Sequence, residues 1–448
     1  MLENIKSIYI VGIGGISLSA IALILKNKGF DICGSDLEYS NEIAKLQQQN
    51  IKVVIGHSKD FVLKCDALVY SLAVENDEDV LLAKKLNKKI FSRAEILGML
   101  SQGYQTISIA GTHGKTTTTG LISSIFLEAK KDPNIHIGGV LNNINSNVNI
   151  SISDILITEA CEYKDSFLFL KNTVSVILNI KEDHLDYFKN IDNIFNSFQK
   201  FSNNTLNNGI IVINSDDKLC CKIKNNSKIL TYGIENLNAE LRAINIVEQT
   251  GKYCFDVVFR NEKLFTINLP CYGRHNIYNA LASIGVSLFY GIEREFIKRG
   301  IENFKGVKRR FEYINELNNN LIIHDYAHHP DEIKAVIETG NEIKKEKIIV
   351  IFQPHTYSRT KLLFKDFIKS LELCDEVWLL PIYPAREKPI KNVSSYKLYK
   401  SLKSKNVKVK YFQSFLECYS YLKKYKENNK LFEILGAGDI VKLADMLR

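Results

Sequence analysis

The stretch from Gln105 to Lys130 constrains the fold more than any other part of the chain. It contains a short apolar segment, Gln105 to Ala110, then a glycine turn, Lys115 with four threonines, and an amphipathic segment that ends near Lys130. We interpret these as a strand, a turn and a helix. In this order they present backbone N–H groups and the positive end of the helix dipole to a bound phosphate. The sequence therefore predicts a parallel α/β sheet that holds a nucleotide triphosphate at the end of this strand.

The residue types of the turn fit such a site. Lys115 would reach the β- and γ-phosphates, and the Thr116 hydroxyl would ligand Mg²⁺. The longer pattern G-x-x-x-x-G-K-[ST] is not met, because Ile109 stands where its first glycine belongs. The alternative is a turn without a ligand, but threonines at the start of a helix are unfavourable unless their hydroxyls have partners. The predicted nucleotide-binding residues are Gly111, Thr112, His113, Gly114, Lys115, Thr116 and Thr117.

Length and composition indicate a multidomain α/β protein. A chain of 448 residues is too long for one ordinary core, and we place three domains at 1–98, 99–306 and 307–448. The formal charge of +9 is weak evidence for nucleic-acid binding, because basic residues are interleaved with acids, and it fits an anionic small substrate equally well. We expect no nucleic-acid partner. Nine cysteines without a C-x-x-C pair favour a reduced, cytoplasmic compartment.

The first segment begins with an apolar run, Ile8 to Leu25, which resembles a signal peptide or a membrane anchor. Gly12, Gly14 and Gly15 interrupt the run where a strand would turn into a helix, so we interpret it as a buried strand followed by a buried helix and expect no integral membrane contact. Asp36 follows the next strand, roughly 20 residues after the glycines, as in folds that bind a ribose. The third glycine comes too early for a plain dinucleotide site, so another diphosphate ligand or a packing turn fits better.

The middle segment places polar residues after further predicted strands. Glu159 stands at the end of the strand from Asp154, and His184 follows the strand from Val174, among acidic residues. Glu159 suits a second Mg²⁺ ligand, whereas His184 alone would be a surface residue or a ligand of a second cation. Asn276 and Asn279 lie one helical turn apart and could bind an adenine edge or serve packing. We expect a polar loop at 138–149 and a small antiparallel sheet at 228–268.

The third segment restarts the strand and helix alternation, with strands expected from Leu321, Lys347, Glu376, Val407 and Leu431. Polar residues cluster after these strands, at the edge where a parallel sheet binds ligands. If this domain closed over the nucleotide, it would bring cations to the transferred phosphoryl group. The alternative for each residue is an ordinary surface charge. The candidates are Arg310, Asp325, His328, His355 and Arg359.

Taken together, these motifs resemble the Mur ligase family of peptidoglycan synthesis, over the whole chain. The stretch from Ala110 to Thr117 is similar to the ATP loop of that family, which accounts for the departure from the longer pattern. The stretches that carry the resemblance further are Gly12-Ile-Gly-Gly15, Asp325-Tyr-Ala-His-His-Pro330, Phe352-Gln-Pro-His-Thr-Tyr-Ser-Arg-Thr360 and Leu435-Gly-Ala-Gly-Asp-Ile440. The resemblance implies an N-terminal Rossmann-like domain for a UDP-sugar, a central ATPase domain and a C-terminal Rossmann-like domain.

The resemblance also implies substrates and roles. ATP with Mg²⁺ would activate the lactoyl carboxylate of UDP-N-acetylmuramate for attack by L-alanine. Carried over, Lys115 and Thr116 serve the phosphates and the metal, Glu159 and His184 ligand metal, and Asn276 contacts adenine. Arg310 would bind phosphate, Asp325 the ribose, His355 and Arg359 the amino acid, and Gly12, Gly14, Gly15, Asp36 and His328 the substrate. Cys161 and Thr356 differ from the Asp and Arg that some relatives carry.

Three other functions remain open at this level. A related ligase reattaches a recycled tripeptide to the same UDP-sugar through the same ATP site. A nicotinamide-dependent oxidoreductase would use the N-terminal glycines but would leave Lys115 without a role. A protein that only binds or switches on nucleotide would show no substrate-stimulated phosphate release. The sequence leaves the oligomeric state open.

Overall fold

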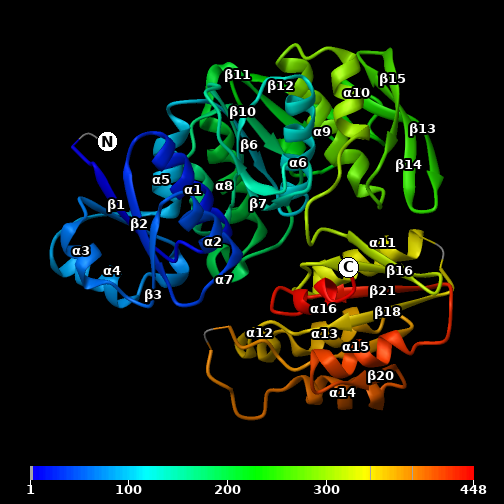
Figure 1. The fold of residues 1–448 in the computed structure, drawn as a ribbon. Helices are drawn as coiled ribbons and strands as arrows, with labels where there is room; N and C mark the ends of the chain where they lie inside the picture. The colour runs from blue at the N-terminus through cyan, green and yellow to red at the C-terminus, as the bar shows by residue number, and fades with distance from the viewer. Residues whose placement is uncertain (1–3, 344, 386) are drawn as a thin grey trace. The chain divides into compact units, whose positions relative to one another are not determined.

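The computed structural model describes residues 4–343, 345–385 and 387–448, which form three α/β sheets (Figure 1). The described chain divides into two compact units. The first unit comprises Met1–Ile246, Phe255–Pro270 and His275–Lys305, and the second comprises Val247–Cys254, Cys271–Arg274 and Gly306–Arg448. The predicted fold class is confirmed.

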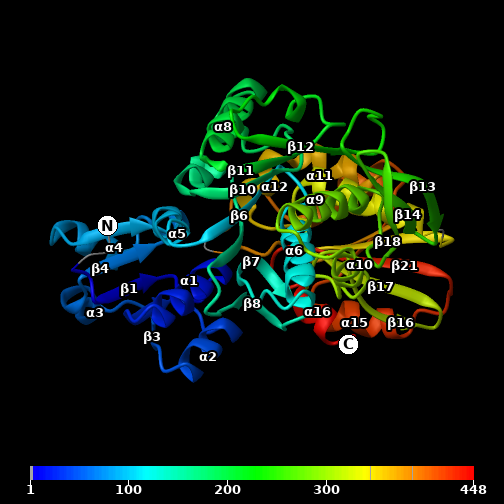
Figure 2. The ribbon, with the colours of Figure 1, turned by 90° about the horizontal axis from the view of Figure 1, so that it is seen from above.

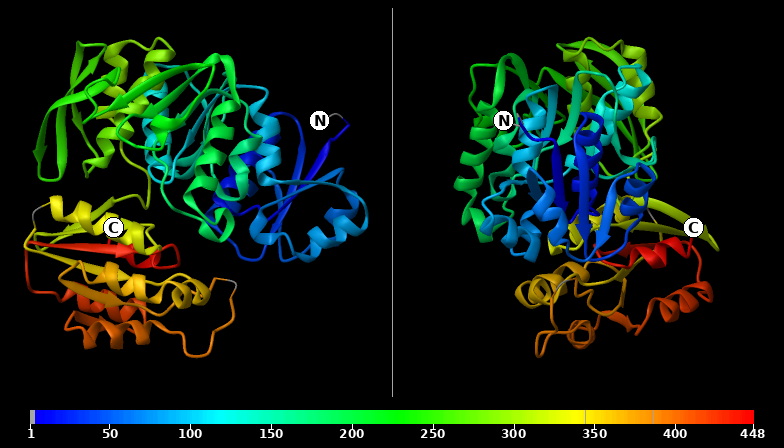
Figure 3. Two further views of the ribbon diagram at one scale, coloured as in Figure 1. Left: turned by 180° about the vertical axis from the view of Figure 1, so that it is seen from behind. Right: turned by 60° about the vertical axis from the view of Figure 1, so that its left-hand side comes forward.

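The first sheet belongs to the first unit and is wholly parallel, with the strand order β3-β2-β1-β4-β5. Its strands lie side by side in the right-hand view of Figure 3. The apolar run at its start forms β1, a tight turn and α1, as predicted. The elements are β1 (Ser7–Val11), α1 (Ile16–Asn27), β2 (Asp31–Asp36), α2 (Asn41–Gln48), β3 (Lys52–Ile55), α3 (Lys59–Lys64), β4 (Ala67–Tyr70), η1 (Leu72–Val74), α4 (Glu78–Lys85), β5 (Lys89–Ser92) and α5 (Arg93–Ser101).

Within residues 4–343, 345–385 and 387–448, every helix is too short or too polar to cross a lipid bilayer.

The second sheet has ten strands in the order β15-β14-β13-β12-β11-β10-β6-β9-β7-β8. Strand β6, which precedes the glycine turn, lies between β10 and β9 and pairs parallel with both. Helices α6 and α9 pack against each other beside this sheet (Figure 2). The elements up to β10 are β6 (Gln105–Ala110), α6 (Lys115–Glu128), β7 (Asn134–Leu141), β8 (Ser146–Asn149), β9 (Ile155–Glu159), η2 (Tyr163–Phe169) and β10 (Asn172–Ile177). They continue with α7 (Leu185–Phe188), α8 (Ile191–Asn203), β11 (Thr205–Asn214), η3 (Cys220–Lys222), β12 (Lys228–Gly233), β13 (Leu241–Gln249), β14 (Lys252–Phe259), β15 (Glu262–Leu269), α9 (His275–Phe289) and α10 (Arg294–Glu302).

Two predictions for the middle segment need correction. The asparagine-rich stretch 138–149 is not a loop, because most of it forms the antiparallel hairpin β7–β8. Its asparagine amides bind main-chain carbonyls of neighbouring elements: Asn147 Nδ2 donates to Ile16 O at 2.5 Å, and Asn142 Nδ2 donates to Lys305 O at 2.9 Å. The strands at 228–268, expected to form a small antiparallel sheet appended to this domain, extend the ten-stranded sheet as β12 to β15, and β12 pairs parallel with both β11 and β13.

The third sheet lies in the second unit, in the order β16-β17-β21-β18-β19-β20, with only the β16–β17 pair antiparallel. Strand β21, red in Figure 3, occupies the middle. A buried apolar cluster covers each face, and Trp378 of β19 belongs to one of them. The elements are β16 (Glu312–Leu317), β17 (Asn320–Asp325), α11 (Pro330–Glu342), β18 (Lys347–Phe352), α12 (Tyr357–Leu362), α13 (Phe364–Leu371), β19 (Glu376–Leu379), α14 (Ser395–Ser404), β20 (Lys408–Tyr411), α15 (Phe415–Lys423), β21 (Lys430–Leu435) and α16 (Val441–Asp445).

Candidate active site

The predicted phosphate loop has the backbone conformation that its glycines allow. Gly111 has φ of +145° and Gly114 has φ of +88°, and Gly114 caps α6 directly before Lys115. A Cβ atom at Gly111 would lie 2.9 Å from Cβ of Leu178, and one at Gly114 would lie 2.6 Å from Oδ1 of Asn279. Both the conformation and the close packing therefore require glycine at these two positions.

Residues after β10 hold the loop through hydrogen bonds. Asn179 O accepts a hydrogen bond from Thr112 N at 3.1 Å, and its side-chain Oδ1 accepts from His113 N at 2.9 Å. Lys181 N donates to the Thr112 hydroxyl at 2.9 Å. These bonds hold the loop in a fixed shape at the N-terminus of α6, with Thr116 buried and Thr117 partly exposed in the first turn.

Lys115 turns its ammonium group into the loop and toward one carboxylate. Nζ lies 2.5 Å from Gly111 O, 3.2 Å from Thr112 O, and 3.1 and 3.0 Å from the two carboxylate oxygens of Glu162. Burial acts to lower the pKa of Lys115, but the charge and hydrogen bond of Glu162, together with Cys161 and Glu159, outweigh it and the pKa is raised. A cation held beside the glycine turn is suited to a phosphate ligand.

A group of metal-type side chains lies next to this lysine. One oxygen each of Glu162 and Asp183 and one ring nitrogen of His184 all lie within 4.8 Å of one another. Glu159 is not part of this group: its Oε1 accepts a hydrogen bond from Gly138 N at 2.7 Å. The predicted His184 is therefore brought beside two carboxylates that the sequence reasoning did not select. The signal available was their position in the segments that follow β9 and β10.

The two asparagines of α9 also border the loop. Asn276 and Asn279 are buried, and Asn279 Nδ2 donates to Asn276 Oδ1 at 2.7 Å. Asn279 also approaches Gly114 closely, as the limited space for a Cβ atom there shows. The pair thus lies beside the phosphate loop, with one member bound to the other.

The predicted diphosphate turn and its acid come together at the end of the first sheet. Asp36 Oδ2 accepts a hydrogen bond from Gly14 N at 2.9 Å, and Oδ1 accepts from Leu37 N at 2.8 Å. Gly12 has φ of +78°, and Gly15 caps the N-terminus of α1. Asp36 therefore stabilises the glycine turn itself.

Arg93, which the sequence reasoning missed, reaches the start of the same helix. Its Nη1 donates to the Ser17 hydroxyl at 3.3 Å. His136 of β7 lies between Ser17 Oγ and Thr158 Oγ1, at 2.8 Å from each. Burial, with the charge of Arg93, lowers the pKa of His136 to about 3, so its ring is neutral. This partly buried network links the first sheet to the second within one unit, and it places a cation at the N-terminus of α1.

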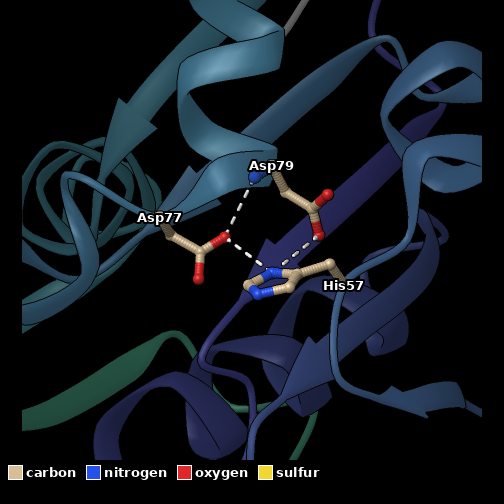
Figure 4. A group of neighbouring side chains, drawn as sticks. All are labelled: His57, Asp77 and Asp79. Carbon is tan, nitrogen blue, oxygen red and sulfur yellow. Dashed lines mark hydrogen bonds and ion pairs between the residues drawn. The ribbon is translucent and has the colours of Figure 1, made fainter. Parts of the chain in front are cut away.

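A second group of metal-type residues, His57, Asp77 and Asp79, lies after β3 and β4 (Figure 4). Its hydrogen bonds account for it without an ion. Asp77 caps α4 by accepting from Asp79 N at 3.0 Å, and its Oδ1 lies 3.3 Å from His57 Nδ1. Asp79 Oδ2 accepts from Tyr9 Oη at 2.5 Å and Ser58 N at 2.9 Å. The cluster is therefore a capping network.

In the second unit, the predicted residues Arg310, before β16, and Asp325, at the end of β17, lie around one turn. Asp325 Oδ2 accepts from Phe311 N at 2.7 Å, and Oδ1 accepts from Ala327 N at 2.8 Å. Burial raises the pKa of Asp325 against the opposing effect of Arg310. The guanidinium of Arg310 lies 5.8 Å from the ring centre of Tyr326. Asp325 therefore shapes the backbone of this turn from a buried position.

Two predicted histidines and an arginine form a second group in this unit. The rings of His328 and His355 lie 5.8 Å apart, and Arg359 Nη1 lies 3.2 Å from Nδ1 of His355. Burial, together with His328 and Arg359, lowers the pKa of His355 to about 4, so the ring is neutral near pH 7 and can accept from Arg359. Thr356, next to His355, has φ of +68°, which is uncommon for a β-branched residue. The group lies at the carboxyl ends of β17 and β18.

Models of one protein family match residues from all three sheets. Family models match in succession: "Mur ligase family, catalytic domain" over residues 7–105, "Mur ligase middle domain" over 109–287, and "Mur ligase, glutamate ligase domain" over 309–438. The chain belongs to the Mur ligase family. A UDP-N-acetylmuramate–L-alanine ligase from Clostridium acetobutylicum is 42% identical over 98% of this chain and 97% of its own. One from Clostridium botulinum (strain Langeland) is 43% identical over the same shares.

Solved structures of Mur ligases have the same architecture. The UDP-N-acetylmuramate-alanine ligase of Thermotoga maritima superposes with a TM-score of 0.83 at 27% identity, covering 98% of each chain. A murein peptide ligase from Psychrobacter arcticus gives a TM-score of 0.73 at 20% identity over 99% of this chain and 98% of its own, which shows the shared fold. The predicted family is thus confirmed across the chain.

Proposed function

We propose that this Mur ligase joins L-alanine to the lactoyl carboxylate of UDP-N-acetylmuramate, with conversion of ATP to ADP and phosphate. The observation that carries the proposal is the phosphate loop at the end of β6, where Lys115 lies beside Glu162 and the group formed with Asp183 and His184. The curated relatives at more than 40% identity bear the name of this activity. The reaction is an early step of peptidoglycan synthesis.

The chemistry requires activation, because a free carboxylate is a poor acyl donor at neutral pH. The lactoyl carboxylate attacks the γ-phosphorus of ATP, ADP leaves, and an acyl phosphate forms. The amine of L-alanine then attacks the acyl carbon, and phosphate leaves as the amide bond forms. Lys115, whose Nζ lies beside the carbonyls of Gly111 and Thr112 and the carboxylate of Glu162, stabilises the charge on the transferred phosphoryl group.

The donor set beside Lys115 fits Mg²⁺. Mg²⁺ takes oxygen ligands and uses few protein groups together with phosphate and water. The oxygens of Glu162 and Asp183 and the Thr116 hydroxyl on the first turn of α6 match that preference, and His184 adds a nitrogen. We propose that these residues hold the metal, which neutralises phosphate charge when bound. Glu159, the sequence-based choice, stays a prediction beside them.

The remaining binding roles belong to residues that lie near the ends of other strands. We propose that the turn of Gly12, Gly14 and Gly15, stabilised by Asp36 and joined by Arg93, binds the UDP-sugar diphosphate. Asn276 binds adenine beside the loop. In the second unit we propose Arg310 for phosphate, Asp325 for ribose, His328 for substrate, and His355 with Arg359 for the amino acid.

Phosphate release from ATP tests the reaction. The expected result is release that requires Mg²⁺, UDP-N-acetylmuramate and L-alanine together. Release with a muropeptide-type tripeptide in place of L-alanine would assign the chain to recycling, and release without any acceptor would leave only nucleotide hydrolysis. Lys115→Ala is expected to abolish turnover while UDP-sugar binding persists. Lys131→Ala, at an exposed lysine just after the same helix, is the matched control.

The metal assignment has its own test. Glu162→Gln and Glu159→Gln remove one charge each, three residues apart. If Glu162 belongs to the metal group, its variant raises the Mg²⁺ concentration needed for half-maximal rate about tenfold or more, because a charged ligand is lost. A larger effect from Glu159→Gln would restore the sequence-based choice.

A further inference from the structure

One stretch carries all of the excess positive charge of the chain. Residues 391–426 contain ten lysines and one glutamate, so their formal charge is +9, equal to that of the whole 448-residue chain. The remaining residues are therefore neutral in sum. The interpretation that basic residues are interleaved with acids is wrong for this stretch, because it considered the total charge without its position.

The stretch folds into one edge of the third sheet. Its elements are α14, the edge strand β20 and α15, which follow one another in the chain and lie together in Figure 1. Nine of the ten lysines are exposed and Lys410 is partly exposed. Among the described residues, Lys405 and Lys408 alone of the ten form ion pairs, with Glu372 at 2.6 Å and Glu376 at 2.5 Å. We call this surface, residues 391–426, the basic edge.

Apolar side chains are exposed among these lysines. Leu416, in the first turn of α15, is 67% exposed, Tyr396 of α14 is 46% exposed, and Tyr421 is 39% exposed. Exposed lysines together with exposed leucine and tyrosine side chains are typical of surfaces that bind lipid headgroups. The apolar side chains enter the boundary between headgroups and acyl chains, and the lysine ammonium groups contact anionic headgroups.

Two features distinguish this surface from a nucleic-acid site. Residues 391–426 contain no arginine, the side chain best suited to bidentate phosphate and base contacts. The rings of Tyr396 and Tyr399 stack on each other at 5.4 Å, and Lys400 and Lys403 lie 5.0 and 5.7 Å from their centres. Ring faces engaged in this way are not free to stack on bases.

Protection of the sheet edge explains only part of the charge. Lysines on an edge strand hinder pairing with another strand, and β20 carries two of them, Lys408 and Lys410. The other eight lie on or beside the flanking helices, where no strand edge needs protection.

We propose that the basic edge docks this Mur ligase onto an anionic phospholipid surface. The attraction is electrostatic with shallow insertion of Leu416 and Tyr396, so it is reversible and weakened by salt. Each lysine near such a surface contributes about a fivefold change in affinity. The docking surface is independent of the residues that we assign to ATP and the UDP-sugar.

Co-sedimentation with vesicles tests the proposal. The full chain is mixed with phosphatidylcholine vesicles that contain about one-third phosphatidylglycerol, at about 0.05 M and about 0.5 M salt. The test variant replaces four basic-edge lysines by glutamine (Lys397, Lys400, Lys403 and Lys424). The matched control replaces four exposed lysines of the first unit (Lys59, Lys64, Lys85 and Lys89). Trp378 fluorescence and phosphate release confirm that each variant is folded and active.

The expected result is binding at low salt that is lost at high salt and absent with pure phosphatidylcholine. The test variant, with four lysines replaced, should bind about 600-fold more weakly, and the control should bind like the parent. Absence of vesicle binding, or equal weakening of both variants, overturns the proposal. Binding to polyuridylate RNA without binding to vesicles would also overturn it, in favour of a nucleic-acid partner.

Discussion

Replacement of Glu433 by glutamine is expected to stabilise the second unit relative to the parent protein, by an amount that grows as the pH rises. Glu433 lies on β21, between Ile323 of β17 and Val350 of β18, and is fully buried. Neither carboxylate oxygen has a hydrogen-bond partner among the described residues. Burial, with a smaller contribution from Asp325, raises the pKa of Glu433 to about 8. The carboxyl is therefore neutral in the folded protein near pH 7.

The magnitude follows from the difference between the folded and unfolded chains. In the unfolded chain the carboxyl of Glu433 has the ordinary pKa of 4.5. Below that pH the carboxyl is protonated in both the folded and the unfolded state, so its ionisation does not change the free energy of unfolding. As the pH rises, the unfolded state loses its proton first and is favoured. From about pH 5 to about pH 8, the free energy of unfolding falls by about 3 to 4 kcal/mol through this group alone. Above the folded pKa the loss levels off.

The chain provides a specific probe for this measurement. Trp378 is its single tryptophan, is fully buried on β19 of the same sheet, and lies 5.4 Å from the ring of Phe432, next to Glu433 in the chain. Its fluorescence during urea unfolding therefore reports on the second unit. Glu338→Gln, at an exposed position of α11, is the control for loss of one carboxylate.

Ionisable groups that do not interact with Glu433 titrate equally in both proteins, so the comparison is the stability of Glu433→Gln minus that of the parent at each pH. We expect this difference to grow by about 3 kcal/mol between about pH 5 and pH 8, with no such growth for Glu338→Gln. A difference that stays constant across this range would refute the reasoning, because it would mean that Glu433 ionises in the folded state as readily as in the unfolded chain.

Three further substitutions follow from the geometry. Gly114→Ala should weaken ATP binding at least about tenfold, measured by calorimetry. Residue 114 has a left-handed backbone conformation, and the added Cβ would also clash with Asn279. Gly291→Ala, also at positive φ but with open space for the Cβ, should leave ATP binding unchanged. Arg93→Gln should raise KM for the UDP-sugar about tenfold with little change in KM for ATP, and equal changes in both would remove its assignment to the diphosphate. Phe167→Ala removes a fully buried ring and should lower stability by about 3 to 5 kcal/mol in thermal or urea unfolding; a loss below about 1 kcal/mol would contradict its core position.

Local patterns in the sequence were sufficient for the strands and the glycine turns. The predicted strand from Gln105 to Ala110 has the same bounds as β6, and the strands expected from Lys347 and Glu376 begin where β18 and β19 begin. Each is a short apolar run bounded by residues that end a strand, so short-range preferences decide it. Gly111 and Gly114 were recognisable for the same reason, because their role depends on backbone conformation next to Lys115.

The asparagine-rich stretch at 138–149 shows where local preference is insufficient. Asparagine and glycine favour loops when isolated, but here the chain pairs as β7 and β8 because its amides and backbone find partners in distant segments. Such partners are far away in the sequence, so composition alone predicted a loop.

The sequence by itself determined the three α/β segments, the glycine turn before Lys115 and the family. Only the tertiary structure decided which carboxylate faces Lys115. Glu159 and Glu162 both follow β9, but Glu159 turns to Gly138 while Glu162 turns to Lys115 and His184. The physical reason is that a strand specifies where the chain leaves the sheet, whereas the direction of the next side chains depends on the backbone that follows and on partners from other strands.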